Sequence, residues 1–185
     1  MKPEASIFIA CSLDGFIAGP DGNIDWLNKA NEVVPAGEDC GFQDFINNID
    51  TLVMGRKTFE QVLTFGTWPY GDLRVVVLSR NDVNIPDDLR KTVSSSSDSP
   101  KELSRYLASI GAQQLYIDGG FTIQSWLQAG LINKLIITFV PVLLGSGIPL
   151  IGELDREINL KHIHTQTYDF GFIQVTYDII KGDHT

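Results

Sequence analysis

Apolar and polar positions alternate along this chain in patterns that predict strands and helices in turn. Short apolar runs between turn residues indicate buried strands, and apolar positions three or four residues apart indicate helices. The runs predict strands at 5–10, 51–54, 73–78, 114–118 and 135–140, then an antiparallel pair at 160–167 and 173–180. The helical spacing predicts helices at 39–49, 56–63, 101–110 and 121–129, the third of them capped by a serine-rich turn at 94–100. Such alternation predicts an α/β fold with a mostly parallel central sheet covered by helices and an antiparallel C-terminal edge.

The stretch 51–60 carries the first chemical signal. A strand turns through Gly55 into a helix here, which leaves backbone N–H groups free at the helix start. These groups and the helix dipole attract anions, above all phosphates. Arg56 and Lys57 add positive charge, and Thr58 adds a hydroxyl. The pattern indicates either a phosphate-bearing ligand or a solvated Arg–Lys pair at an ordinary turn.

Two further turns have the same character. Ser79 and Arg80 follow the predicted strand at 73–78, and Gly119 with Gly120 follows the strand at 114–118 and opens a helix. In a parallel sheet, the ligand crevice lies at the carboxyl ends of the strands. We therefore expect the turns at positions 55, 79 and 119 to meet at one phosphate-binding site.

A long loop follows the first strand. It contains the turn dipeptides Asp14-Gly15 and Asp21-Gly22. Because ordering a long loop costs entropy, such a loop next to a core strand is usually functional. The segment 12–28 is predicted to be a lid over the site, with a plain surface hairpin as the alternative.

Composition narrows the function classes. The 185 residues suit a single domain, 1–185, and the net charge of −9 argues against nucleic-acid binding. Two cysteines without a CxxC motif argue against a disulfide scaffold or a zinc cluster. His162 and His164, two apart on a strand, favour a solvated strand face over a metal pair, so no metal is predicted. No apolar stretch reaches the roughly 18 residues of a membrane span, and a cytoplasmic protein is expected.

The motif Met54-Gly55-Arg56-Lys57-Thr58-Phe59-Glu60 resembles the signature of the dihydrofolate reductase superfamily. The stretches 10–17, 78–80 and 118–122 resemble its first strand and mobile loop, its ribose-phosphate strand end and its double-glycine turn. With the stretch 141–147, the chain is most similar to the branch of the riboflavin biosynthesis reductase, the RibD C-terminal domain, and its small stand-alone relatives. The resemblance implies a dihydrofolate reductase-like three-layer αβα fold.

The resemblance also implies NADPH as cofactor. Arg56 or Lys57, with Ser79 and Arg80, would bind the ribose phosphate. These residues would select NADPH over NADH, because a cation stabilises the additional phosphate dianion that only NADPH carries. Gly119 and Gly120, a pair that often has a cis bond in this superfamily, would approach the pyrophosphate. The complete set of cofactor residues that the resemblance implies is Ala10, Ile17, Gly55, Arg56, Lys57, Thr58, Leu78, Ser79, Arg80, Gly119, Gly120, Phe121 and Thr122.

The substrate half of the resemblance leaves alternatives open. Dihydrofolate reductases place one carboxylate against the pterin, and Glu32 and Asp39 are alternative candidates for it. Asp14, Phe16 and Trp26 are further candidates for substrate contact, with turn capping as the alternative role of Asp14. Phe16 stands where the riboflavin enzymes carry a basic residue, which suits a flatter or less charged substrate.

These observations predict an NADPH-dependent reductase that passes a hydride to a small heterocyclic substrate, pteridine-like or pyrimidine-like. It would be similar to the 5-amino-6-(5-phosphoribosylamino)uracil reductase domain. The alternatives are a dihydrofolate reductase and an NADPH-binding module without catalysis. The expected partner is a small molecule, and a homodimer is plausible through the segment 142–151 and the terminal strands.

Overall fold

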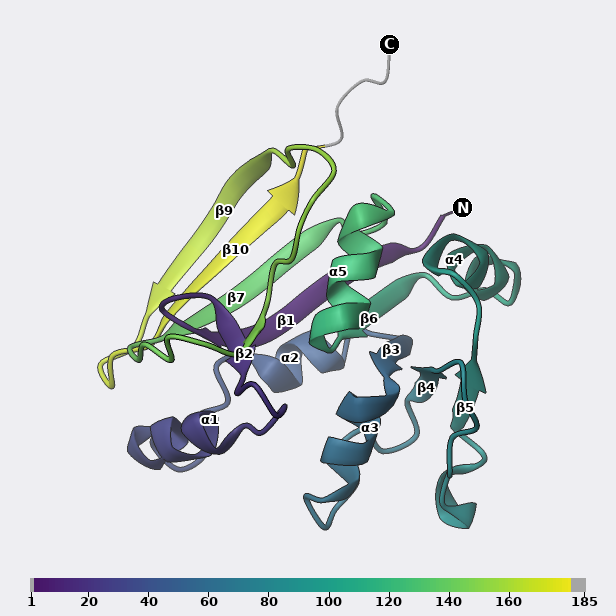
Figure 1. Cartoon of the computed structure of the whole chain (residues 1–185), viewed down its shortest axis with the longest axis horizontal. Coiled ribbons are helices and arrows are strands. Elements are labelled where there is room, and N and C mark those ends of the chain that lie inside the picture. The colour runs from purple at the N-terminus through teal and green to yellow at the C-terminus, as the bar shows by residue number, and fades with distance from the viewer. Residues whose placement is uncertain (1, 181–185) are drawn as a thin grey trace.

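The apolar runs of the sequence form an eight-stranded sheet with helices on both faces, in a computed structural model that describes residues 2–180 (Figure 1). The strands are β1 (Glu4–Ser12), β2 (Phe16–Ala18), β3 (Thr51–Gly55), β4 (Arg74–Leu78), β5 (Val93–Ser96), β6 (Gln114–Asp118), β7 (Lys134–Val140), β8 (Ile148–Pro149), β9 (Leu160–Thr167) and β10 (Ile173–Ile179). The α-helices are α1 (Asp25–Ala30), α2 (Phe42–Ile46), α3 (Arg56–Leu63), α4 (Pro100–Ser109) and α5 (Gly120–Gln128), and the 3-10 helices are η1 (Asn31–Val33) and η2 (Asp87–Leu89).

The strand order across the sheet is β5-β4-β3-β6-β1-β7-β10-β9. The first six strands are parallel, and β10 runs antiparallel to both of its neighbours. The predicted fold class is therefore confirmed: a mostly parallel sheet with an antiparallel C-terminal edge. This order also places the carboxyl ends of β1, β3, β4, β5 and β6 along one rim of the sheet.

Two apolar clusters, one on each face of the sheet, produce the three layers. On one face, Leu103 and Leu107 of α4 and Trp126 of α5 are buried against the sheet. On the other face, Phe59 of α3 is fully buried, and the rings of α2 pack beside it. Burying one side chain of this size contributes about 1.5–3 kcal/mol, so these contacts hold α3 and α5 firmly against the rim.

Some elements were not predicted from the sequence. The stretch 94–96, predicted as part of a turn, belongs to β5, because Val93 pairs with Val75 and Ser96 with Leu78 across a parallel ladder. The capping part of that prediction is confirmed, since Ser99 and Glu102 form a reciprocal capping box at the start of α4. The strand β2 and the helix α1 lie in the predicted loop, and β8, which pairs with β2, lies in the segment 142–151, for which no strand was predicted.

The two histidines of β9 do not face the same way. A β-bulge shifts the register, so that His162 pairs with Tyr177 and His164 pairs with Thr176. Neighbouring residues of a strand point to opposite faces, and the partners of the two histidines are neighbours in β10. Within residues 2–180, no group of three or more His, Cys, Asp or Glu side chains is arranged to hold a metal ion.

The strand β9 closes the sheet as an edge, and all eight of its residues are exposed. An uncovered edge strand can pair with another chain, but nothing in this single chain tests the predicted homodimer, which stays a prediction. None of the helices between residues 2 and 180 has the length and hydrophobicity to cross a bilayer.

Candidate functional site

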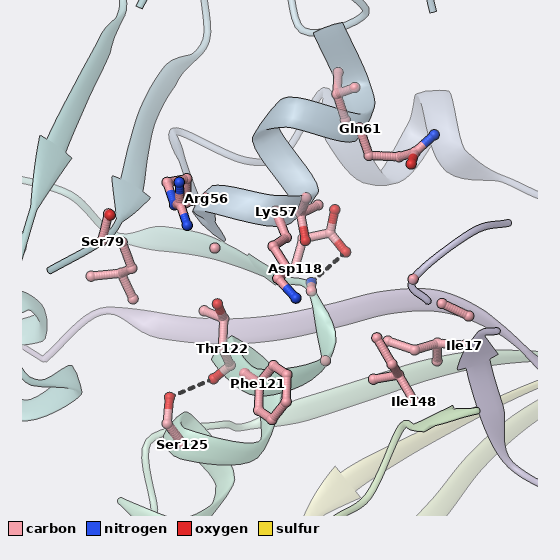
Figure 2. A pocket seen from close by; sticks show the side chains of 18 of the residues that line it. Ile17, Arg56, Lys57, Gln61, Ser79, Asp118, Phe121, Thr122, Ser125 and Ile148 are labelled. Atoms are coloured by element: carbon pink, nitrogen blue, oxygen red, sulfur yellow. Dashed lines mark hydrogen bonds between the residues drawn. The ribbon is translucent and has the colours of Figure 1, made fainter. Parts of the chain in front are cut away.

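A cavity of about 950 Å³ lies at the rim where the parallel strands end (Figure 2). Its walls come from the ends of β1, β3, β4, β5 and β6, from the starts of α3 and α5, and from the β2–β8 ribbon. The residues that the sequence predicted for the cofactor all line it: Ala10, Ile17, Gly55, Arg56, Lys57, Thr58, Leu78, Ser79, Arg80, Gly119, Gly120, Phe121 and Thr122. The fold thus brings four separate sequence segments together at one place.

The first corner of the cavity is the start of α3. Gly55 ends β3 beside Leu78 of β4 and serves as the N-cap residue of the helix. No side chain caps this helix, so its first backbone N–H groups are free to bind a ligand. Thr122 lies close by, because a Cβ atom on Gly55 would stand 3.0 Å from its hydroxyl oxygen. The corner therefore combines open donors with the charges of Arg56 and Lys57.

The second corner is the double glycine at the start of α5. Gly119 has a φ of +90°, a conformation that favours glycine, and a side chain there would collide with the Thr58 hydroxyl. A Cβ atom on Gly120 would lie 2.8 Å from Ile148. The expected cis bond is wrong: no cis peptide occurs in residues 2–180, and the positive φ of Gly119 makes the turn instead. This helix start also has no side-chain cap.

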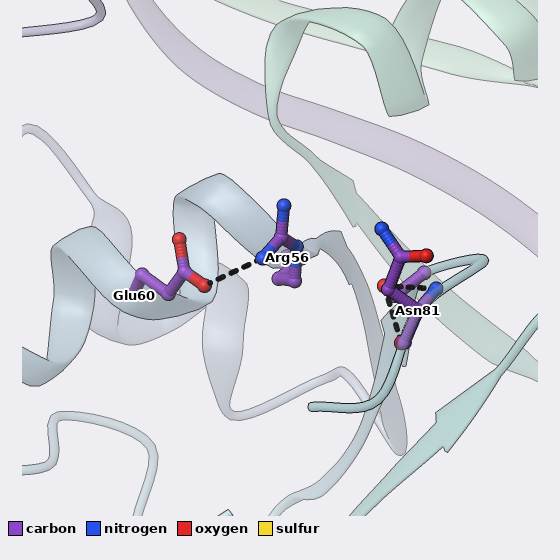
Figure 3. Close-up of polar contacts among 4 residues, drawn as sticks. Arg56, Glu60 and Asn81 are labelled. Carbon is purple, nitrogen blue, oxygen red and sulfur yellow. Dashed lines mark hydrogen bonds and ion pairs between the residues drawn. The ribbon is translucent and has the colours of Figure 1, made fainter. Parts of the chain in front are cut away.

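The third corner follows β4 and carries the predicted ribose-phosphate contacts. The Ser79 hydroxyl donates to the Asn81 carbonyl at 2.7 Å and accepts from the Asn81 N–H at 3.1 Å, which shapes the turn (Figure 3). Arg56 pairs with Glu60 at 3.3 Å across one turn of α3. Both partners are exposed, so the pair contributes only about 0.3–0.5 kcal/mol. A bound phosphate dianion can therefore compete for the Arg56 guanidinium.

A fourth segment of the cavity was missed as part of the site. Ser96, the last residue of β5, and Ser97 and Asp98 after it line the cavity next to the β4 corner. The Ser96 hydroxyl donates to Asp98 at 2.9 Å. The stretch had been interpreted as a turn and a helix cap. The missing signal was the strand β5, whose carboxyl end lies on the same rim as the others.

Asp118 was included in the predicted double-glycine motif, but no binding or catalytic role was predicted for its carboxylate. It ends β6 beside Met54, and its half-buried carboxylate lines the cavity. Burial raises the pKa of Asp118 to about 6, although its hydrogen bond from the Gly119 N–H, at 2.8 Å, acts in the opposite direction. Tyr70 lines the same cavity, and burial, followed by the charge of Asp118, raises its pKa. An acid that titrates near neutral pH in a ligand cavity is suited to proton transfer.

The other carboxylates proposed for catalysis lie off the cavity. Glu32 is exposed in η1 and contributes nothing to the cavity wall. Asp39 accepts hydrogen bonds from the backbone N–H groups of Gly41 and Gln43, both at 2.8 Å, at the start of α2. Neither side chain lines the cavity, whereas Asp118 does, beside Lys57 at the start of α3 (Figure 2).

The three predicted substrate residues are also absent from the cavity wall. Asp14 has the alternative role of a turn cap: its carboxylate accepts from the N–H groups of Leu144 at 3.1 Å and Gly145 at 2.7 Å. The Ser12 hydroxyl, which donates to Asp14 at 2.6 Å, is the main cause of the lowered pKa of Asp14. Phe16 lies in β2 and Trp26 in α1, and neither lines the cavity.

The predicted lid has two parts. Its first part is anchored, because the Leu13 N–H donates to Val142 at 2.8 Å and the Leu150 N–H donates to the Gly15 carbonyl at 2.9 Å. The second part brings Gly22, Ile24 and Leu27 into the cavity wall. Nothing in this single conformation tests whether the segment opens and closes.

The apolar end of the cavity lies beyond the two glycine turns. Its wall is formed by Ile24 and Leu27 at the start of α1 and by Val62 and Phe65 at the end of α3. These positions had not been predicted as site residues, because the sequence pattern marks them only as part of a loop and as the apolar positions of a helix.

Comparison with known proteins assigns the family. The RibD C-terminal domain family matches residues 3–173. The chain belongs to this family. This RibD C-terminal domain is 34% identical to the protein YwjB of Bacillus subtilis (strain 168) over 164 residues, covering 87% of the chain and 90% of YwjB. It is 28% identical to YyaP of the same organism, with 91% of each chain covered.

Solved structures agree with this assignment. A putative riboflavin biosynthesis protein from Shewanella sp. PV-4 superposes with a TM-score of 0.88 at 37% identity, covering 96% of this chain and 99% of that one. A bifunctional deaminase/5-amino-6-(5-phosphoribosylamino)uracil reductase from Thermotoga maritima gives 0.71 at 15% identity, with 97% and 57% covered. Dihydrofolate reductase from Enterococcus faecalis, complexed with NADP(H), gives 0.63 at 18% identity, with 98% and 99% covered. The RibD C-terminal domain therefore has the dihydrofolate reductase-like fold.

Proposed function

We propose that this RibD C-terminal domain is an NADPH-dependent reductase of a small heterocyclic acceptor. The observation that carries the proposal is the meeting of two uncapped helix starts, at Gly55 and Gly119, across one cavity that also holds three cations, Arg56, Lys57 and Arg80. A dinucleotide offers a pyrophosphate to the helix starts and a further phosphate to the cations. The family membership supports a reductase as the class of enzyme.

The residues present fit the cofactor in size and charge. Gly119 and Gly120 leave room where side chains would collide with Thr58 and Ile148, so a ligand can approach the backbone of the turn. Arg80, an exposed side chain, and Arg56 would bind the ribose phosphate, because an arginine fork matches phosphate oxygens. Ala10 and Ile17 line the cavity near β1 and β2, where their backbone groups would orient the nicotinamide.

Bound NADPH would supply a hydride, with both electrons, to a carbon of a C=N bond in the acceptor, leaving NADP⁺. Asp118 in its protonated form would donate a proton to the neighbouring nitrogen, so that the C=N bond becomes CH–NH. The carboxylate would then recover a proton from solvent. The pKa of Asp118, about 6, keeps enough of the acid form near neutral pH for this role. The apolar wall near Phe65 would limit the access of water to the reacting atoms once cofactor and acceptor fill the cavity.

Cofactor binding and turnover test this proposal separately. NADPH binding is measured by the change in its fluorescence on titration with the protein, and turnover by the fall in NADPH absorbance with a panel of pteridine and pyrimidine acceptors. We expect tight binding and acceptor-dependent oxidation. Tight binding without oxidation of any acceptor would leave the non-catalytic NADPH-binding module as the better account, and absence of binding would contradict both functions.

A further inference from the structure

The character of the cavity wall changes along α3. Lys57, Gln61 and Phe65 are four residues apart, so they lie on one side of the helical path, and all three line the cavity. Phe65 follows the last helical residue, but its N–H still bonds to the Val62 carbonyl at 3.1 Å, which continues the turn. Over about 12 Å, at 1.5 Å per residue, the wall changes from a cation to a neutral amide to an aromatic ring.

The opposite wall changes in the same direction. Arg56 and the Ser79 hydroxyl lie where β4 and the start of α3 meet, Lys57 lies in the middle beside Asp118, and Ile17 and Ile148 of the β2–β8 ribbon lie at the other end with Gln61 (Figure 2). The sheet order separates these ends, because β3 and β6 stand between β4 and β1. Figure 1 places α1, which carries Leu27, on the β2 side, away from β4 and β5.

The charges at the two ends therefore differ. The cations of the cavity wall are Arg56, Lys57 and Arg80, and all belong to the start of α3 or the end of β4. None of the side chains that form the apolar end, Ile24, Leu27, Gln61, Val62 and Phe65, is ionisable, and Asp118 lies nearer the middle of the cavity, beside Lys57 (Figure 2). A phosphate bound against these side chains would lose hydration without a cation in that part of the wall to balance its charge, which costs free energy in a partly buried site.

Resting on the proposed function, we infer that the acceptor is a planar heterocycle without a phosphate group or other negative charge, bound against Phe65, Ile24 and Leu27. The half-exposed ring of Phe65, with 49% of its surface accessible, offers a flat apolar face for stacking. The Gln61 amide offers an NH2 donor and a carbonyl acceptor to the polar edge of the heterocycle. Phe16, which first suggested a less charged substrate, does not line the cavity, so the inference depends on these other residues.

A matched pair of acceptors tests this inference. Initial rates of NADPH oxidation are compared for 5-amino-6-(5-phosphoribosylamino)uracil, for the same compound without its phosphate, and for an uncharged pteridine. We expect kcat/KM to be at least about tenfold higher for the better uncharged acceptor than for the phosphorylated one. Equal or better use of the phosphorylated acceptor would overturn the inference but leave the reductase function standing. Bound NADPH with no oxidation by any acceptor would overturn both.

A charge added to the wall provides the second test. Phe65→Lys places a cation at the apolar end, and it should shift the ratio of kcat/KM at least about tenfold towards the phosphorylated acceptor. Leu63→Lys is the matched control: it adds the same charge to α3 at an exposed position off the cavity and should leave the ratio unchanged. Phe65→Leu should keep the preference for uncharged acceptors. Equal ratios for the two lysine variants would contradict the proposed position of the acceptor.

Discussion

The starts of α3 and α5 differ from the start of α4 in how their backbone N–H groups are used. At α4, Ser99 and Glu102 form a capping box, and the helix satisfies its own first donors. At α3 and α5, the N-cap residues are Gly55 and Gly119, and no side chain accepts a hydrogen bond from the first backbone N–H groups of either helix. Since a glycine N-cap is only a few tenths of a kcal/mol less stable than a good capping side chain, the two glycine corners leave these N–H groups open to a ligand with little loss of stability.

The same contrast holds for single residues. Gly119 has a counterpart off the cavity with nearly the same φ, Gly111, and Asp118 and Arg80 can be compared with carboxylates and an arginine that do not line the cavity. Substituting both members of a pair separates what the residue does for the fold from what it does for the ligand.

Asp118→Asn removes the carboxylate of the cavity wall whose pKa is raised by burial to about 6. We expect kcat to fall by about 10²–10⁴ while the dissociation constant of NADPH stays within about twofold, because a general acid acts in the chemical step. Asp39→Asn and Glu32→Gln change the carboxylates that lie off the cavity and should retain near-normal kcat. A large loss in either of those variants, with Asp118→Asn active, would move the catalytic acid away from β6.

Gly119→Ala and Gly111→Ala test the double-glycine corner. Both glycines have nearly the same φ, +90° and +89°, so both substitutions add a similar backbone strain of about 1–3 kcal/mol. Only at Gly119 does the added Cβ atom collide with Thr58, whereas nothing lies within 4 Å at Gly111. Calorimetric titration should show at least about a 100-fold loss of NADPH affinity for Gly119→Ala alone. Equal affinities in the two variants would exclude this corner from the cofactor site.

Arg80→Ala tests the selection of NADPH. A charged hydrogen bond to phosphate contributes about 1.5–3 kcal/mol, so the dissociation constant of NADPH should rise about 10- to 100-fold. The dissociation constant of NADH, which has no ribose phosphate, should change little. Arg90→Ala is the control, because Arg90 is an exposed arginine paired with Asp87 at 2.9 Å, off the cavity. Losing both cofactors equally would argue against a ribose-phosphate contact at Arg80.

The pH dependence should follow Asp118. Its folded-state pKa, about 6, is above its ordinary value of 3.8, so the folded protein holds this proton more tightly than the unfolded chain does. The contribution of this group to the free energy of unfolding therefore decreases as pH rises from about 4 to 6, and then levels off. In the same protein, kcat should fall about tenfold per pH unit above about 6. Asp118→Asn should remove both trends, and their persistence would assign them to another group.

Local pattern predicted the elements whose signal is contained in a few residues. The strand, glycine and helix of 51–63 were predicted nearly to the residue, because an apolar run, Gly55 and helical spacing follow one another directly. The ribbon of β2 and β8 was missed because Phe16 and Ala18 pair with Pro149 and Ile148, more than a hundred residues away. The turn predicted at 94–96 was wrong for the same reason: those serines form a strand only because β4 lies beside them.

The chemistry of the site divides in the same way. Cations and glycines can be identified from sequence, because Arg56 is charged and Gly119 lacks a side chain in any environment. The importance of Asp118 could not be identified, because its ordinary carboxyl group acquires its raised pKa only through burial. Asp39 and Glu32 were equally good candidates in the sequence, and only their position off the cavity distinguishes them from Asp118.

The strand ends, the glycine turns and the cations can be predicted from local sequence, since each depends on the residue and its immediate neighbours. The tertiary structure decided which of these turns share a cavity, because the strand order β4-β3-β6-β1 brings together segments that are distant in the chain. It also decided where the cavity is charged and where it is apolar. That distribution depends on which side chains are shielded from water, and shielding is a property of the packed molecule.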